Sequence, residues 1–274
     1  LVRNSFLDPR ETYETNVMGT VNLLEAVRLA GGVRVVLNVT SDKCYENREW
    51  EWAYREHEPL GGRDPYSSSK GCSELVTAAF RRSFFASEDA PRLASARAGN
   101  AIGGGDWSRD RLIPDLMRAA LADQAVLVRN PGSTRPWQHV LNPLSGYLTL
   151  IQALWDSPEL AGAWNFGPGE EDVQTVSWIV HRIAGLWPEL LRLIEDPEPA
   201  SREARQLRLD SARARARLGW RPPWDLEEGL LKLVHWYETY RTACAAGDAH
   251  AVSEQMRAET IDQIKAFQHA AVLA

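Results

Sequence analysis

Hydrophobic residues recur at three- and four-residue steps early in the chain, from Tyr13 to Val27. This spacing places them on one face of a helix. The preceding Asp8-Pro9 pair is a helix start, because aspartate caps the free backbone N–H groups and proline fits the first turn. Two glycines at 31 and 32 end the pattern with residues that accept left-handed backbone. We therefore expect a helix from Pro9 to Ala30.

A nearly continuous β-branched run follows, from Val33 to Thr40. Such a run is typical of a parallel strand that is covered on both faces. Its carboxyl end carries Ser41-Asp42-Lys43, and open α/β sheets bind their ligands at this end of the strands. Asp64-Pro65 then starts a second helix, from Tyr66 to Phe85, and the next strand is expected at Leu93 to Ala98.

Later patterns are shorter. They predict helices over 112–122 and 146–155 and strands at 126–129, 138–141, 164–168 and 206–209. Alternation of strands and helices at this spacing predicts an α/β fold with a doubly wound, Rossmann-type parallel sheet and a smaller α/β domain towards the C-terminus.

One expected part of such a fold is not found in the sequence. No glycine-rich G-x-x-G-x-x-G turn follows a first strand, and no acidic residue stands about 20 positions later to hold a ribose. The glycines at 103–105 lie after the two strands and do not replace that turn. We therefore expect a chain that lacks about 80 N-terminal residues, equivalent to about two βαβ units.

Composition narrows the classes of function. The chain has 274 residues, of which 44% are hydrophobic and 25% charged, as in ordinary globular proteins. A net charge of -6 argues against a nucleic-acid-binding surface. No apolar run approaches the ~18 residues of a membrane span. The three cysteines have no metal-ligand spacing, so we expect no metal site and a reducing, cytoplasmic location.

The first candidate for chemistry is Tyr66-Ser67-Ser68-Ser69-Lys70. On a helix, Tyr66 and Lys70 are one turn apart and reach the same side. A lysine ammonium beside a phenol favours the phenolate, which can take a proton from a sugar hydroxyl while hydride leaves the same carbon. Because this spacing also occurs by chance on surface helices, it depends on its neighbours for support.

The second candidate is Ser41-Asp42-Lys43, which combines an acid with a base at a strand end. The alternative is an ordinary strand that ends in polar residues. Other candidates are anion-binding groups for a phosphate or pyrophosphate, which guanidinium groups can grip in bidentate fashion; they are Asn100, Arg111, Arg135 and Arg208. His139, on a predicted strand, is more typical of a core histidine than of a catalyst.

These residues resemble the extended short-chain dehydrogenases/reductases that act on nucleotide sugars, the NAD-dependent epimerase/dehydratase family, and within it the 4,6-dehydratases of CDP-glucose. The resemblance spans essentially the whole chain. It is carried by the stretches 16–20 (NVMGT), 40–47 (TSDKCYEN), 61–71 (GGRDPYSSSKG), 97–100 (RAGN), 103–107 (GGGDW), 135–140 (RPWQHV) and 218–222 (LGWRP).

The resemblance implies a bound NAD and a role for each residue. Tyr66 would be the base for oxidation at C4 of the sugar, supported by Lys70, and Ser41 would bond to the C4 oxygen. Asp42 would protonate the departing C6 hydroxyl, and Lys43 would remove the C5 proton. Relatives that act on thymidine-diphosphate-glucose have an Asp-Glu pair where this chain has Asp42-Lys43, which argues against that substrate.

The resemblance also implies partners and domains. The cofactor would be held by Asn16, Thr40, Tyr66 and Lys70, and the nucleotide sugar by Asn100, Arg111, Arg135 and Arg208. Residues 1–106, with 137–167 returning to them, would form part of the NAD-binding domain. Residues 107–136 and 168–274 would form the nucleotide-sugar-binding domain and a helical tail. The helices at 9–30 and 65–85 would pair two subunits in a homodimer.

Two other functions stay open at this point. A nucleotide-sugar 4-epimerase or reductase also uses Tyr66 and Lys70, but it does not need the Asp42-Lys43 pair for elimination. The other is a truncated, inactive fragment that serves only as a binding or dimerisation module, since the absent glycine-rich turn puts cofactor binding by this chain alone in doubt.

Overall fold

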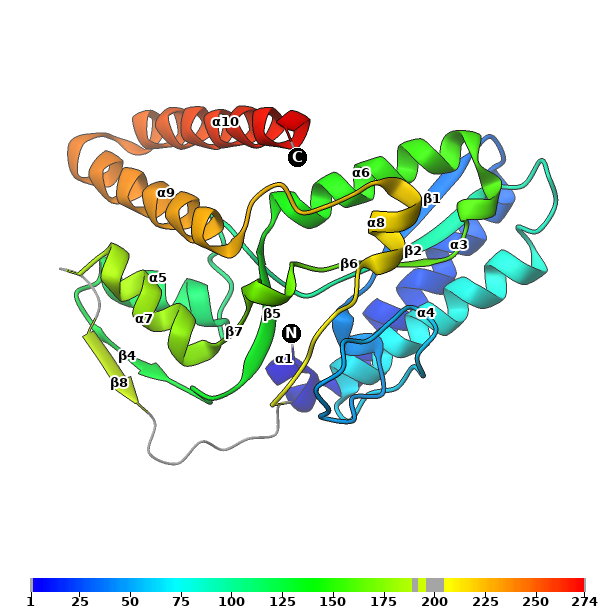
Figure 1. The fold of residues 1–274 in the computed structure, drawn as a ribbon, viewed down its shortest axis with the longest axis horizontal. Coiled ribbons are helices and arrows are strands. Elements are labelled where there is room, and N and C mark those ends of the chain that lie inside the picture. Colours follow the sequence, from blue (N-terminus) through cyan, green and yellow to red (C-terminus); the bar gives the residue numbers. More distant parts are fainter. Residues whose placement is uncertain (1, 189–191, 196–204, 274) are drawn as a thin grey trace. The chain divides into compact units, whose positions relative to one another are not determined.

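The computed structural model describes residues 2–188, 192–195 and 205–273, and Figure 1 shows their fold. The chain divides into two compact units. Unit 1 comprises Leu1–Gly99, Pro143–Gly167 and Leu207–Arg221, and unit 2 comprises Asn100–Asn142, Pro168–Gln206 and Pro222–Ala274. The functional division into domains that the resemblance implies stays a prediction.

Unit 1 is built on a parallel sheet. Its elements are α1 (Val2–Leu7), α2 (Pro9–Tyr13), the π-helix η1 (Glu14–Met18), α3 (Gly19–Ala30), β1 (Val35–Val39), the 3₁₀ turn η2 (Asp42–Cys44), α4 (Pro65–Ser83), β2 (Arg92–Ala98), most of α6 (Leu141–Asp156), η3 (Pro158–Leu160), β6 (Ala163–Phe166) and α8 (Ala212–Leu218). The strand order is β1-β2-β6, with both pairs parallel.

Helices cover both faces of this sheet, as a doubly wound fold requires. On one face, Val36 and Leu93 pack with side chains of α3 and α4, around the buried Leu24. On the other face, Ala94 and Ala96 pack with α6, α8 and the buried Trp164. Successive residues of a strand point to opposite faces, so the alternation along β1 and β2 divides the core into these two layers.

Unit 2 has a separate core of buried residues from its strands and helices. Its elements are β3 (Asn100–Ile102), α5 (Leu112–Leu121), β4 (Ala125–Val128), β5 (Thr134–His139), η4 (Glu170–Asp172), β7 (Val173–Thr175), α7 (Val176–Leu186), β8 (Arg192–Glu195), α9 (Leu226–Ala246) and α10 (Ala249–Leu273). β5 pairs parallel with β3 and antiparallel with β7, while β4 pairs with β8. The long helices α9 and α10 pack on each other.

The predicted α/β fold with a doubly wound parallel sheet is confirmed, while some element boundaries differ. The helix expected from Pro9 to Ala30 is interrupted by the π-helix η1. The strand expected at 138–141 lies at Thr134–His139, because these residues pair with β3 and β7. The strand expected at 206–209 is wrong, since only isolated bridges form there, from Gln206 and Leu209.

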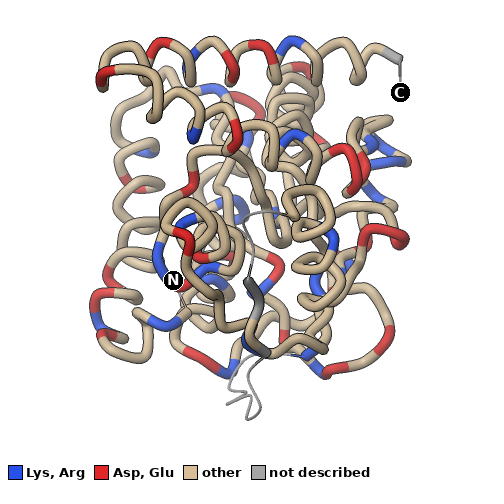
Figure 2. Tube along the Cα trace, turned by 90° about the vertical axis from the view of Figure 1, so that its left-hand side faces the viewer, with Lys and Arg blue, Asp and Glu red and all other residues tan. Residues whose placement is uncertain are grey.

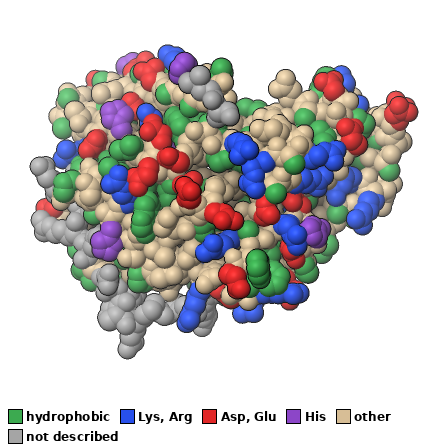
Figure 3. Space-filling model, viewed as in Figure 1, with side chains coloured by type: hydrophobic (Ala, Val, Ile, Leu, Met, Phe, Trp, Pro, Cys, Tyr) green, Lys and Arg blue, Asp and Glu red, His purple; other side chains and the backbone are tan. Residues whose placement is uncertain are grey.

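Acidic and basic residues are interspersed along the chain (Figure 2). The space-filling view likewise shows hydrophobic, acidic and basic side chains intermixed on the face that it presents (Figure 3). Among the described residues, the helices are too short or too polar to span a bilayer.

Candidate active site

A short polar turn follows β1 at its carboxyl end. Thr40 continues the sheet, since its N–H donates to the Ala96 carbonyl at 2.8 Å. Ser41 is extended and caps η2, its hydroxyl oxygen accepting from the Lys43 N–H at 3.2 Å and its O–H donating to Asp42 Oδ1 at 3.0 Å. Asp42 is buried and Lys43 half-buried. The turn thus gathers a hydroxyl, a carboxyl and an ammonium group within three residues.

Helix α4 packs against this turn. Asp64 caps the helix, accepting from the Ser67 N–H at 2.9 Å, and Pro65 occupies its first turn, as expected from the sequence. A Cβ on Gly71 would lie 3.2 Å from the Cys44 carbonyl oxygen, so the absence of a side chain there lets the helix approach η2 closely. Tyr66 and Lys70 therefore stand on the helix that packs against the Ser41-Asp42-Lys43 turn.

Lys70 has the environment of a ligand-binding ammonium. It is half-buried, and desolvation lowers its pKa, while the neighbouring Cys44 and Glu74 act in the opposite direction. Within the described part of the chain, no hydrogen-bond or ion-pair partner of its Nζ is found. A desolvated lysine without a protein partner retains its donors for a bound molecule, such as the hydroxyl groups of a ribose.

Polar side chains join α4 to its neighbours at four-residue steps. The Asn16 amide donates to Ser69 Oγ at 2.9 Å, and the Thr20 and Ser73 hydroxyls are 2.8 Å apart. One turn further, the Asn38 amide of β1 donates to the Thr77 hydroxyl at 2.7 Å. Asn16, a predicted cofactor ligand, thus positions α4 in this structure, and its proposed contact with a cofactor stays a prediction.

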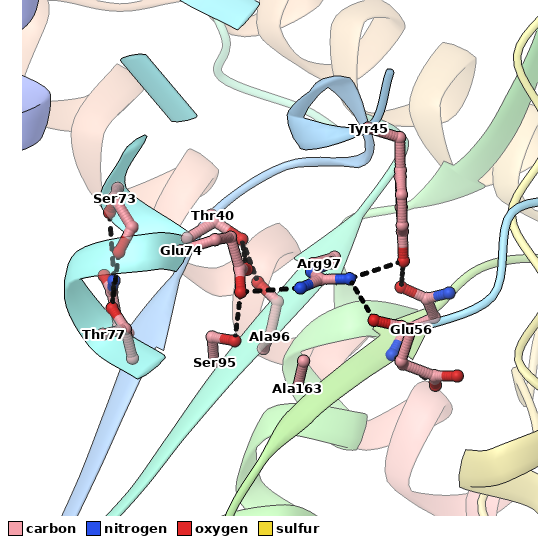
Figure 4. A network of polar contacts seen from close by, with 12 residues as sticks. Thr40, Tyr45, Glu56, Ser73, Glu74, Thr77, Ser95, Ala96, Arg97 and Ala163 are labelled. Carbon is pink, nitrogen blue, oxygen red and sulfur yellow. Dashed lines mark hydrogen bonds and ion pairs between the residues drawn. The ribbon is translucent and has the colours of Figure 1, made fainter. Parts of the chain in front are cut away.

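A buried ion pair joins β2 to α4 in unit 1 (Figure 4). Arg97 of β2 donates to Glu74 of α4 at 2.8 Å, and both side chains are only 3% exposed. Burial alone would raise the pKa of Glu74, but Arg97 and the hydroxyls of Ser95 and Thr40 lower it more, so its pKa is below the ordinary value. The carboxylate is therefore charged and accepts from all three groups.

The network continues from Arg97 to the far side of the polar turn. Its guanidinium donates to the Tyr45 hydroxyl at 2.8 Å and to the Glu56 carbonyl at 3.0 Å. The Tyr45 hydroxyl in turn donates to Asn165 Oδ1 of β6 at 2.7 Å. Burial raises the pKa of Tyr45 far above its ordinary value, so this phenol stays protonated.

Glu74, Arg97, Tyr45 and Asn165 were not among the functional residues predicted from the sequence. Glu74 could have been predicted from its spacing, because it lies one turn after Lys70 and two turns after Tyr66 on one helix face. Its partner Arg97 could not be predicted from helical spacing, since it is 23 residues away on another element.

The predicted substrate-binding residues fall in both units. Arg208 belongs to unit 1, where it is half-buried and its Nε has no hydrogen-bond partner among the residues that the structure describes. Unit 2 holds Asn100, which pairs with Trp137 of β5, and the buried Arg135, which donates to the Thr134 carbonyl at 2.9 Å. Arg111, also of unit 2, is half-exposed and lies 3.5 Å from an Asp106 carboxylate oxygen. Binding of a nucleotide sugar by this set stays a prediction.

His139 has the core environment expected for it, and Cys44 also lies in the core. His139 is buried, and desolvation lowers its pKa to about 4, with Lys232 acting in the same direction, so it is neutral. Cys44 is fully buried, and desolvation raises the pKa of its thiol. No cluster of three or more histidine, cysteine or acidic side chains that could hold a metal ion occurs among the described residues.

A parallel sheet, a Ser-Asp-Lys turn at a strand end and a Tyr-x-x-x-Lys helix packed on that turn define an enzyme of the short-chain dehydrogenase/reductase class. The model of the NAD dependent epimerase/dehydratase family matches residues 1–167. The chain belongs to this family, as the sequence predicts.

Individual relatives agree with this assignment. The CDP-glucose 4,6-dehydratase of Salmonella typhimurium is 52% identical over 245 residues, which are 88% of this chain and 68% of that protein. The dTDP-glucose 4,6-dehydratase of Streptomyces griseus is 28% identical over 88% of this chain and 70% of its own. Among solved structures, the dTDP-glucose 4,6-dehydratase of Streptomyces venezuelae with NAD bound has a TM-score of 0.72 at 25% identity, covering 88% of this chain and 71% of that chain.

Proposed function

We propose that this protein converts CDP-glucose to CDP-4-dehydro-6-deoxyglucose with NAD, as a hydro-lyase. The observation that carries the proposal is the packing of the Ser41-Asp42-Lys43 turn against the helix that bears Tyr66 and Lys70. Oxidation and elimination need different groups, and this arrangement supplies both sets at one strand end. The 52% identity to the Salmonella enzyme supports CDP-glucose as the substrate.

The residues at this strand end fit a dinucleotide's ribose. Lys70 is a half-buried ammonium without a protein partner among the described residues, which suits a ribose hydroxyl. Tyr66, Asn16 and Thr40 complete the set that we assign to the cofactor. When bound, NAD supplies the acceptor and later the donor of the hydride that moves between C4 and C6 of the sugar.

The protein's own groups move the protons. Tyr66, as a phenolate stabilised by the Lys70 ammonium, takes the proton of the C4 hydroxyl, while Ser41 bonds to the same oxygen. The C4 ketone that forms acidifies the C5–H bond, and Lys43 removes that proton. Asp42 protonates the C6 hydroxyl, which leaves as water, and a proton returns to C5 when C6 is reduced.

The proposal extends to the rest of the substrate and to the assembly. We assign the diphosphate and sugar to Asn100, Arg111, Arg135 and Arg208, and a homodimer to contacts through the helical segments 9–30 and 65–85. The helices α3 and α4 expose the large apolar side chains Leu23, Leu29 and Leu75, and Phe84, also exposed, directly follows α4. We also propose that the enzyme acts in the cytoplasm, without nucleic acid or membrane as partner.

The test is an assay of the protein, in the full length that its gene encodes, with NAD and separately with CDP-, UDP- and dTDP-glucose. We expect a 4-keto-6-deoxy sugar from CDP-glucose. In Asp42→Asn, C4 oxidation should persist while loss of water falls at least ~100-fold, the usual scale of acid catalysis. A product that keeps its C6 hydroxyl would show an epimerase or oxidase instead, and no turnover of any substrate would refute the proposal.

A further inference from the structure

The acid/base turn is short, and both of its flanks are bonded to the same buried ion pair. Thr40 precedes the turn and donates to Glu74 Oε1 at 2.5 Å. Tyr45 follows the turn and accepts from Arg97 at 2.8 Å. Figure 4 shows Glu74 and Arg97 between these two flanking residues. The segment from Ser41 to Cys44 is therefore held at both ends by one pair of charges.

The same pair is attached to the helix of the oxidation residues. Glu74 lies on α4, one turn beyond Lys70 and two turns beyond Tyr66. Each end of the turn is thus linked to that helix through Glu74, directly from Thr40 or by way of Arg97 from Tyr45. The ion pair thus bridges the helix that bears Tyr66 and Lys70 and both flanks of the turn that bears Asp42 and Lys43.

Stability alone does not account for charges at this position. Removing two charges from water costs several kcal/mol per ion, and apolar pairs of similar volume often stabilise a core as well or better. Charged groups, however, form hydrogen bonds in defined directions. The Glu74 carboxylate accepts such bonds from Thr40, Ser95 and Arg97 at the same time. A hydrophobic core at this position would supply none of these directional bonds to the turn, and a misplacement of about 1 Å can cost a catalyst ~100-fold in rate.

We propose that Glu74 and Arg97 are positioning residues of the dehydration step, which hold Asp42 and Lys43 in register with Tyr66 and Lys70. This inference rests on the proposed function for its kinetic consequence but not for its structural one. Tyr66 and Lys70 stand on α4 itself and keep their places when the tethers are cut. Loss of the tethers therefore slows elimination more than oxidation.

The experiment cuts the two tethers and leaves the ion pair intact. Thr40→Val removes the bond to Glu74, and Tyr45→Phe removes the bond to Arg97, each with little change of shape. The double variant Thr40→Val/Tyr45→Phe is compared with Thr77→Val. Thr77 is a fully buried hydroxyl of the same helix, bonded to Asn38 and not to the turn, so its variant controls for loss of a buried hydrogen bond.

Two measurements are made on the full-length protein. The first is amide hydrogen exchange over residues 40–46, which needs neither substrate nor turnover. We expect exchange at least ~10-fold faster in the double variant than in wild type, and unchanged exchange in Thr77→Val. The second is turnover with CDP-glucose, followed at 340 nm for reduced cofactor. We expect kcat to fall ~10- to 100-fold while the reduced fraction in the steady state rises.

The outcomes separate the two proposals. A general loss of folding would lower kcat without raising the fraction of reduced cofactor. If the double variant behaves in this way, the positioning role is overturned. Exchange rates over 40–46 equal to those of Thr77→Val overturn it as well. If wild-type protein makes no product, the proposed function is wrong, and the exchange comparison alone decides whether the ion pair holds the turn.

Discussion

The contribution of Glu74 to the free energy of unfolding depends on pH, and replacement of Arg97 by methionine is expected to invert that dependence. In the wild type the pKa of Glu74 is below its ordinary value, so its contribution to stability is present above about pH 4.3 and is lost as the pH falls through the lowered pKa. In Arg97→Met the burial of the carboxyl remains but its cation is gone. Its pKa then rises above the unfolded value, and the contribution is lost as the pH rises.

The magnitude follows from the burial of the pair. Both side chains are 3% exposed, and breaking such a pair by removing one partner costs about 3–5 kcal/mol. This figure includes the bonds of Arg97 to the Tyr45 hydroxyl and the Glu56 carbonyl. A deficit of this size is expected at pH 8, where Glu74 must ionise. At pH 5 the buried carboxyl is protonated instead, and the deficit should be at least about 1.4 kcal/mol smaller.

The assay is urea unfolding at pH 5, 6.5 and 8, followed by circular dichroism for wild type, Arg97→Met and Arg97→Met/Glu74→Gln. The double variant contains no carboxyl at this position, so its deficit should not depend on pH. Equal deficits of Arg97→Met at pH 5 and pH 8 would refute the argument, because they would mean that Glu74 does not carry an uncompensated charge.

Four further predictions concern single positions in the chain. Because desolvation lowers the pKa of Lys70, activity should fall on the alkaline side below its ordinary value of about 10.4, and a kcat profile that is flat to pH 10 would contradict this. Gly62→Ala should lower stability by about 1–3 kcal/mol and impair turnover, since its Cβ would lie 2.3 Å from the backbone nitrogen of Ser68. Gly185→Ala, with open space around the new methyl group, should instead stabilise by about 0.4–1 kcal/mol in the same thermal or urea melts. The pKa of His139, lowered from 6.5 to about 4, implies that its contribution to stability is present above about pH 6.5. About 3 kcal/mol should be lost between pH 6.5 and 4, and the loss should be absent in His139→Gln.

The parts of the fold that the sequence predicts are those with local causes. β1 and α4 follow from a β-branched run and from a cap at Asp64-Pro65, and both lie close to their expected positions. The strand β5 was misplaced because its residues pair antiparallel with Val173–Thr175, a contact between distant segments. The expected strand at 206–209 has the composition of a strand, but its neighbours offer only isolated bridges.

The candidate site divides in the same way. Tyr66-x-x-x-Lys70 and Ser41-Asp42-Lys43 could be proposed from spacing, since each is contiguous in the chain. That α4 packs on the turn, through the close approach at Gly71, is a tertiary contact. The Glu74–Arg97 pair needs two elements in contact and two buried charges in one place, which sequence periodicity does not report.

The hydroxyl groups of α4 have a consequence for how this protein can change. Ser69, Ser73 and Thr77 bond to neighbouring segments at four-residue intervals. A helix that packs through apolar side chains can slide by a fraction of a turn and repack. A row of hydrogen bonds instead fixes both the position of the helix along its axis and its rotation about that axis. A one-residue insertion ahead of Ser69 would rotate every following hydroxyl by about 100°. An insertion or deletion between Ser69 and Thr77 is therefore expected to break at least one of these bonds.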